Sequence, residues 1–252
     1  MLEIHPHEGG IRELRLARPP ANALDAALVG ELIRAVEGAP EAGVRALVLS
    51  GGPKMFSAGL DVPVLLGLGR PEMEAFLGDL LALLRSIATS RVPVIAAITG
   101  HSPAGGAVLA IHCDYRVMAE GDFRIGLNEV AVGLPLPRVI HSTLSRLVGP
   151  AAAEKLAVAG ALIGGAEALR LGLIDELAPP EAVVERALAR ARDLLALPPR
   201  AMSATRALAR RDLAESFARE ERATWEAFVE DWFSPETQGA LRALVERLKK
   251  KS

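Results

Sequence analysis

Several residue types that mark particular classes of protein are scarce in this chain. Among its 252 residues there is one cysteine, Cys113, so the chain can form neither an internal disulfide nor a zinc site built from several thiolates. The five histidines show none of the spacings of metal-binding motifs. His5 and His7 stand close together, but two histidines near a chain end are more often incidental than metal ligands. The sequence therefore predicts no metal site.

Neither a surplus of one charge nor a long apolar run is present. The chain has 29 basic and 31 acidic residues, whereas nucleic-acid-binding proteins usually carry a basic surplus. Its longest apolar runs, such as VPVIAAI, are too short to span a bilayer. The first residues, MLEIHPHEGG, lack the apolar stretch of a secretory signal. These features predict a cytoplasmic protein with no nucleic-acid partner and no membrane partner.

Aromatic residues make up only 4% of the chain, although half of its residues are hydrophobic. The core must therefore consist mainly of Ala, Leu and Val packed at helix and sheet spacing. Four of the large aromatics, Trp225, Phe228, Trp232 and Phe233, gather near the C-terminus. Because an aromatic patch is rarely left in water, we expect a neighbouring subunit to cover it.

Short strand-like and helical segments alternate along the first half of the chain. Residues 11–17 (IRELRLA) alternate in polarity with a period of two, and residues 44–51 and 92–100 are apolar runs that end in glycine. Residues 24–39 and 71–90 instead carry apolar side chains at helical spacing. Alternation of this kind is typical of α/β folds with strand–helix–strand crossovers.

Strand signals fade after about residue 135, and the remaining segments all read as helices separated by glycine and proline. Asn22 or Asp25 is expected to cap the helix over 24–39, and Ser234 is expected to cap the last helix. We divide the chain into an α/β core, residues 1–195, and a helical C-terminal region, residues 196–252. That region is expected to cover the core or to pack on a neighbouring subunit.

Two segments rich in glycine and small residues are candidates for sharp turns into helices: residues 57–61 (SAGLD) and 102–114 (SPAGGAVLAIHCD). The first N–H groups of a helix have no partner within it, and two that converge on one point can stabilise a developing oxyanion. Small residues let a substrate approach the backbone closely. The pattern indicates an oxyanion hole; the alternative is that small residues only allow a helix to pack tightly on a sheet.

Glu129 lies among apolar residues in the segment 123–137, FRIGLNEVAVGLPLP. A carboxyl group against apolar walls has a raised pKa, which suits it to take and return a proton near neutral pH. The alternative is a glutamate at a solvent-facing loop edge. Asp61 and Asp114 also lie near turns, where a short carboxylate usually accepts hydrogen bonds from local backbone N–H groups.

Five motifs closely resemble those of the crotonase family, the enoyl-CoA hydratase/isomerase superfamily: RPPANALD, FSAGLD, PAGGAVLAIHCDYRVMA, IGLNEVAVGLPLP and AEALRLGLIDELAPPEAV, in that order. The resemblance extends from about residue 11 to the C-terminal FVEDWFSPETQGALRALVERLK. It implies an α/β fold, a crotonase-like spiral of β-β-α units with a helical C-terminal region, assembled as a homotrimer or homohexamer. It also implies an enzyme of fatty acid metabolism that binds acyl-CoA thioesters and stabilises their enolates with no metal and no redox cofactor.

Carried over position by position, the resemblance assigns the oxyanion donors to the N–H groups of Leu60 and Gly105. Glu129 matches the acid/base of the family. The residues implied to bind the CoA thioester come from the two turns, from the RPPANAL loop and from the C-terminal region: Ala21, Ala23, Ser57, Ala58, Asp61, Gly106 and Phe228.

Hydratases of the family use two glutamates, and the first of these positions is Val108 in this sequence. A valine can neither bind nor deprotonate water, so one base remains, and one base suffices to move a proton from C2 to C4 of a 3-enoyl-CoA. The motifs also resemble the 3,2-trans-enoyl-CoA isomerase branch more than the hydratase branch. We therefore expect an enoyl-CoA isomerase.

Other functions remain open on the sequence. One is hydratase, hydrolase or other crotonase chemistry, for which Asn128, Arg138 and His141 could supply polar groups. Another is a non-catalytic acyl-CoA-binding protein, which would bind CoA without turnover that depends on Glu129. RNA binding, which the family also includes, needs a basic surface that the balanced charge does not predict.

Overall fold

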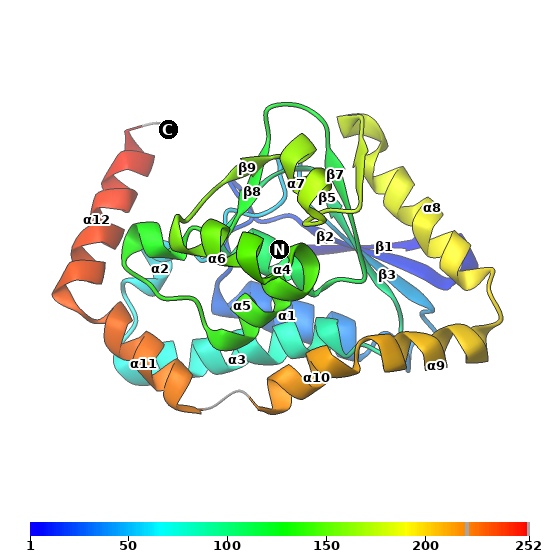
Figure 1. The fold of residues 1–252 in the computed structure, drawn as a ribbon, viewed down its shortest axis with the longest axis horizontal. Coiled ribbons are helices and arrows are strands. Elements are labelled where there is room, and N and C mark those ends of the chain that lie inside the picture. The colour runs from blue at the N-terminus through cyan, green and yellow to red at the C-terminus, as the bar shows by residue number, and fades with distance from the viewer. Residues whose placement is uncertain (220–221, 251–252) are drawn as a thin grey trace.

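A computed structural model describes residues 1–219 and 222–250 of the chain (Figure 1). Its α/β part is built on two β-sheets. In the larger sheet β1 and β2 run antiparallel and the other neighbours run parallel. Its order is β1 (Leu2–His7), β2 (Ile11–Leu16), β3 (Ala46–Ser50), β5 (Val94–Ile98), β7 (Tyr115–Ala119) and β10 (Glu176–Ala178). The smaller sheet has the order β4 (Lys54–Met55), β6 (Gly100–Pro103), β8 (Arg124–Gly126) and β9 (Ile163–Gly164).

The chain passes repeatedly from the larger sheet to the smaller sheet and then into helices. The first passage is β3, β4, α2 (Val62–Leu65) and α3 (Arg70–Ala88). The second is β5, β6 and α4 (Gly105–His112), and the third is β7, β8, η2 (Glu129–Val132) and α5 (Arg138–Val148). This is the repeated β-β-α unit that the family resemblance implies.

The central strands of the larger sheet are buried on both faces. Along β3, Leu47 and Leu49 join the cluster beneath α1 (Ala26–Glu37), α3 and α4, whereas Ala46 and Val48 join the cluster beneath α8 (Val183–Leu195). Burial on both faces explains why such strands read as continuous apolar runs instead of alternating in polarity.

The helix starts follow the sequence signals. The Asp25 side chain accepts a hydrogen bond of 2.9 Å from the N–H of Leu28 and so caps α1, which decides between the two predicted capping residues. Ser234 accepts from the N–H of Thr237 at 3.2 Å and caps α12 (Pro235–Lys249), as predicted. The apolar face expected over 71–90 is the buried face of α3.

Two strands occur where only helices were predicted. β9 pairs with β8, and β10 pairs with β7. They are two and three residues long, too short to show an alternation of polarity. The pairing with strands distant in the sequence, which is a tertiary effect, makes them strands.

The helices of the second half cover the α/β core. They include α6 (Pro150–Val158), α7 (Gly165–Leu171), α9 (Pro199–Ala209), α10 (Arg211–Ala218) and α11 (Arg222–Trp232), with the short 3-10 turn η3 (Pro180–Ala182). Another 3-10 turn, η1 (Glu8–Gly10), connects β1 to β2. Figure 1 shows α9 to α12 running along two sides of the molecule. α10 and α11 pack on α3, and α12 packs on η2 and α2, so the described part of the C-terminal region covers the chain's own core. The boundary at residue 195 stays a prediction.

The aromatic patch predicted for a subunit interface is largely buried within the chain. Trp232 is 0% exposed and Phe228 is 5% exposed, and Trp225 and Phe233 are half-buried against the same core. The expectation that a neighbour must cover these rings is therefore wrong, because α11 folds back onto α3. The oligomeric state itself stays a prediction. None of the described helices is long and apolar enough to cross a membrane.

Candidate active site

Three neighbouring strands of the smaller sheet bring the predicted catalytic residues to one edge. β4 pairs parallel with β6, and β6 pairs parallel with β8, so their carboxyl ends lie on the same side. Leu60 follows β4, Gly105 follows β6, and Glu129 follows β8. The backbone of the second turn is also bonded directly to the strand before Glu129, since the N–H of Ala104 donates to the carbonyl of Gly126 at 2.8 Å.

The two glycine-containing turns lie backbone against backbone. A Cβ atom added to Gly59 would lie 2.8 Å from the amide nitrogen of Gly105, and one added to Gly105 would lie 3.0 Å from the Cα of Gly59. Gly59 also has a φ of +85°, a conformation that residues with a side chain rarely adopt. Small residues are therefore required here so that the two backbones can approach each other.

Neither predicted oxyanion donor makes an internal hydrogen bond within residues 1–219 and 222–250. On either side of Leu60, the N–H of Leu24 donates to Gly59 O at 2.7 Å and the N–H of Asp61 donates to Leu24 O at 2.9 Å. The N–H of Leu60 takes part in neither bond. The N–H of Gly105 is at the start of α4, where helical N–H groups lack a partner.

Ala104, which precedes α4, is held in a backbone conformation that is rare for a residue with a side chain. Its φ is 45° and its ψ is −123°. Strain of this kind persists only where the surrounding structure enforces it, and it concentrates at functional sites. Here the bond from its N–H to Gly126 and the close approach of Gly59 enforce the turn that ends at the Gly105 N–H.

The carboxyl group of Glu129 meets the requirement for a general base. Its Oε2 atom is buried with no hydrogen-bond partner among the described residues. Burial raises the pKa of Glu129 to about 7, and a backbone hydrogen bond lowers it by less. The neighbouring Asn128 also has a buried side-chain oxygen, Oδ1, with no partner in the described part of the chain. A carboxyl group with this pKa can both accept and return a proton near neutral pH.

The short helix that carries Glu129 is fixed by the C-terminal region. The hydroxyl of Thr237, on α12, donates to the carbonyl of Gly133 at 2.8 Å, and the side chain is 1% exposed. Gly133 ends η2 with a left-handed φ of 80°. The sequence reasoning missed Thr237, because no local pattern shows that a residue so distant in the chain reaches this loop.

The residues predicted to line the CoA moiety belong to two chain segments that are hydrogen-bonded to each other. Ala21, Ala23 and Ala58 are half-buried, and the N–H of Ala58 donates to Ala21 O at 2.9 Å. Ser57 is 0% exposed, and its hydroxyl donates to Asn22 O at 2.7 Å. The Ser57 side chain thus holds the two segments together, and contact of these residues with CoA stays a prediction.

Three further predicted residues have clear structural roles. Asp61 caps α2 by accepting from the N–H of Val64 at 3.2 Å and pairs with Arg18, a residue that the sequence reasoning did not select. A Cβ on Gly106 would lie 2.4 Å from the carbonyl oxygen of Ser57, so close packing explains this glycine. Phe228 lies in the core, and its participation in an acyl pocket stays a prediction.

No second carboxylate stands on α4. Val108, where the family's hydratases place a glutamate, is 3% exposed and belongs to the apolar core. His112, at the end of the helix, is buried, and burial lowers its pKa to about 4, so it is neutral at pH 7. Burial raises the pKa of Cys113 to about 12, so it is no nucleophile. Both residues have a structural role.

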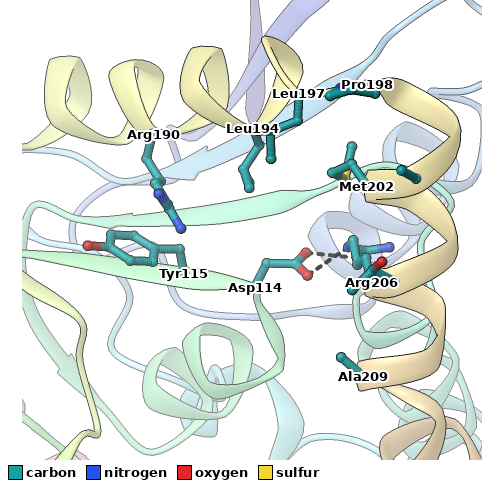
Figure 2. Close-up of a pocket in the computed structure, with 11 residues that line it drawn as sticks. Asp114, Tyr115, Arg190, Leu194, Leu197, Pro198, Met202, Arg206 and Ala209 are labelled. Atoms are coloured by element: carbon teal, nitrogen blue, oxygen red, sulfur yellow. Dashed lines mark hydrogen bonds and ion pairs between the residues drawn. The ribbon is translucent and has the colours of Figure 1, made fainter.

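A cavity of about 460 Å³ lies at the amino end of β7 in the larger sheet (Figure 2). It is bounded by α8, by α9 and by Asp114 and Tyr115 at the amino end of β7. The Asp114 carboxylate accepts two bonds from Arg206, at 2.7 and 2.8 Å. None of the candidate active-site residues lines this cavity, so it is separate from the candidate active site.

The described residues contain no group of three or more His, Cys, Asp and Glu side chains that could hold a metal ion. The candidate site brings together backbone N–H donors and the carboxyl group of Glu129. This combination can stabilise an enolate and transfer protons.

Comparisons with known proteins show which family the chain belongs to. The sequence model of the family "Enoyl-CoA hydratase/isomerase" matches residues 6–251. The chain is 31% identical over 250 residues to the human protein "Enoyl-CoA delta isomerase 1, mitochondrial", covering 98% of this chain and 83% of that protein. It is 35% identical over 204 residues to "Probable enoyl-CoA hydratase EchA17" of Mycobacterium tuberculosis, covering 79% of this chain and 77% of that protein.

The fold has a close counterpart among solved structures. The crystal structure of human mitochondrial delta3-delta2-enoyl-CoA isomerase superposes with a TM-score of 0.94 at 30% identity, covering 100% of this chain and 99% of the other. The predicted crotonase-like α/β fold with a helical C-terminal region is thereby confirmed. The chain belongs to the enoyl-CoA hydratase/isomerase family, the crotonase superfamily of acyl-CoA enzymes.

Proposed function

We propose that this protein is an enoyl-CoA isomerase that moves the double bond of a 3-enoyl-CoA to the 2-position. The observation that carries the proposal is Glu129, which follows the strand beside the second glycine turn. Its Oε2 atom is buried with no hydrogen-bond partner among the described residues, and burial raises the pKa of the carboxyl group to about 7. α4 carries no second carboxyl group that could activate a water molecule.

The reaction needs one proton carrier and one oxyanion site. The Glu129 carboxylate takes a proton from C2, and the electrons of that C–H bond move to the thioester oxygen and form an enolate. The N–H groups of Leu60 and Gly105 donate hydrogen bonds to this oxygen. The thioester C=O bond then re-forms, the electrons of the C1–C2 enolate double bond move to make the C2–C3 double bond, and the electrons of the C3–C4 double bond take the proton from Glu129 at C4. Atoms and charge balance, and the carboxylate is restored.

Hydration of a 2-enoyl-CoA is the second candidate, because the mycobacterial relatives are named as probable hydratases. This reaction needs a group that positions and activates water, and Val108 cannot do so. Asn128, Arg138 and His141 are the polar residues that other crotonase chemistry could use. A non-catalytic acyl-CoA-binding protein would use the oxyanion turns without Glu129.

A substrate panel with a matched variant tests the proposal. Wild type and Glu129→Gln are assayed with 3-enoyl-CoA esters of several chain lengths and with crotonyl-CoA, and ester binding is measured by calorimetry. Wild type should isomerise 3-enoyl esters faster than it hydrates crotonyl-CoA. The variant keeps the shape of the side chain but loses its basicity, so its isomerase rate should fall by about 10²–10⁴-fold with little change in affinity.

Each other outcome supports a different function. Faster hydration than isomerisation by wild type would make the protein a hydratase. Ester binding without turnover in either protein would make it a binding protein. Isomerisation by Glu129→Gln at the wild-type rate would remove Glu129 from the mechanism.

A further inference from the structure

We propose that Arg18 is a positioning residue: it holds the turn that presents the Leu60 N–H to the oxyanion site. The inference rests on the proposed function in one respect, because the proposed function assigns the Leu60 N–H to the substrate carbonyl. Nothing in the reaction itself requires an arginine at this place.

The guanidinium of Arg18 joins three parts of the chain. Its Nη2 atom lies 2.5 Å from Asp61 Oδ2 and 3.0 Å from Asp25 Oδ2, and its Nη1 donates to the carbonyl of Ala23 at 3.2 Å. All three charged side chains are largely buried, with exposed fractions of 17% for Arg18, 16% for Asp25 and 10% for Asp61. The contacts are therefore shielded from water, so the attraction between these charges is stronger than in a surface ion pair.

These contacts act on the backbone on either side of Leu60. Asp61 directly follows Leu60 and caps α2, while Asp25 caps α1. Leu24, beside Asp25, bonds through its N–H to Gly59 O at 2.7 Å and through its carbonyl to the N–H of Asp61 at 2.9 Å. Arg18 thus links the caps of both helices exactly where the two backbone segments pair, and this fixes the direction of the Leu60 N–H.

Removal of the guanidinium would leave two carboxylates facing each other. Asp25 and Asp61 both contact the same nitrogen of Arg18, so without it they repel one another in a partly buried space. The segments around Leu24 and Leu60 would then separate. A small displacement of a catalytic donor is costly, because about 1 Å can reduce a rate by about 10²-fold.

Lysine is the informative substitution at this position. It keeps the positive charge, but its single nitrogen cannot reproduce the planar fork that contacts two carboxylates and a carbonyl. Arg18→Lys should therefore fold and bind CoA esters with a KM within about threefold of wild type, while kcat falls about 10- to 100-fold.

A spectroscopic measurement separates positioning from general destabilisation. Saturated butanoyl-CoA, labelled with ¹³C at the thioester carbonyl, does not react, and an oxyanion hole lowers the stretching frequency of its bound carbonyl. We expect a lowered frequency in wild type and a smaller shift in Arg18→Lys.

Arg206→Lys is the matched control. Arg206 is 15% exposed and binds Asp114, which is 12% exposed, with the same fork, at the amino ends of β5 and β7 (Figure 2). The control should lose thermal stability to a similar extent but keep the wild-type kcat and carbonyl frequency.

The outcomes discriminate clearly. A wild-type carbonyl shift and kcat in Arg18→Lys, or an equal loss in Arg206→Lys, would overturn the inference. If Arg18→Lys fails to fold, Asp61→Asn, which keeps an oxygen to cap α2 but weakens the pair with Arg18, must show the smaller shift. A protein that polarises the carbonyl through Arg18 but does not isomerise 3-enoyl esters would refute the proposed function and leave this inference intact.

Discussion

The space between Gly59 and Gly105 is too small for a methyl group, since a Cβ on Gly59 would lie 2.8 Å from the amide nitrogen of Gly105. Gly59→Ala would place a carbon atom against the predicted oxyanion donor and force alanine into a φ of +85°. We expect kcat to fall by about 10²–10³-fold, as when one oxyanion donor is removed. Steady-state kinetics check this.

Gly78→Ala is the control for that substitution, because nothing lies within 4 Å of a Cβ added to Gly78 in α3. It should keep wild-type activity and gain stability, since alanine favours helix by about 1 kcal/mol over glycine. Full activity in Gly59→Ala would argue against the oxyanion assignment.

Glu129 should make both activity and stability depend on pH. Burial raises its pKa from 4.5 to about 7, so between these values the folded chain holds a proton that the unfolded chain has lost. Its contribution to the free energy of unfolding therefore falls as pH rises through this window. Glu129→Gln lacks this dependence and should be more stable than wild type at pH 8, with no gain at pH 4.

Chemical denaturation of both proteins from pH 4 to pH 8 measures this difference. His112 contributes in the opposite sense, because its pKa is lowered to about 4 and its contribution rises with pH between about 4 and 6.5. It is present in both proteins and cancels in the comparison. In wild type kcat/KM should rise with pH to a plateau above about 7, and a flat profile from pH 5 to 8 would contradict the role of Glu129.

Thr237→Val should disturb the loop that carries Glu129. The substitution removes the hydroxyl that donates to Gly133 O and leaves this part-buried carbonyl without that partner, at a cost of about 1 kcal/mol. As the loop loosens and water reaches the carboxyl group, the apparent pKa in the activity profile should fall. Thr237→Ser keeps the hydroxyl and should restore the wild-type profile; an unchanged pKa in Thr237→Val would limit Thr237 to stability.

Val108→Glu tests what separates isomerisation from hydration. The new carboxyl group would stand on α4 at a position that is 3% exposed, so the variant should be less stable than wild type, by about 3–5 kcal/mol where the group is ionised. The ratio of crotonyl-CoA hydration to isomerisation should rise. Val108→Gln, which has the same shape but no basicity, is the control, and equal ratios in the two variants would contradict the expectation.

Self-association, predicted as a homotrimer or homohexamer, should involve α9. This helix has no buried residue; Leu208 within it is 66% exposed, and Leu197 just before it is 49% exposed. Sedimentation at micromolar concentration should show a trimer or larger species, and Leu208→Glu should shift it toward monomer. The control is Val158→Glu, on α6, where another exposed apolar side chain is replaced. A wild-type monomer would refute the prediction.

The elements that could be predicted from the sequence are those with local signals. Asp25 and Ser234 cap helices as expected, and the apolar face of α3 is buried. The strands β9 and β10 could not be predicted, because pairing with distant strands creates them. The aromatic rings of α11 were misassigned for the same reason, since composition does not show which surface a helix will cover.

The candidate site shows the same division. Glu129 and the two glycine turns have local patterns, and the structure places the segments that carry them after adjacent strands. Arg18 and Thr237 act over distances in the chain that no local pattern reports. Their contribution is visible only when the backbone segments are brought together.

The smaller sheet separates the reactive groups from the elements that stabilise the fold. β4, β6 and β8 are each followed within five residues by one proposed reactive group, and each belongs to a different turn of the spiral. A single substitution after one short strand can thus change the chemistry while the six-stranded sheet and its helices keep the same packing. The two proposed donors and the proposed base thus come from three separate segments of the chain, which the packing of Gly59 against Gly105 and the bond from Ala104 to Gly126 hold together.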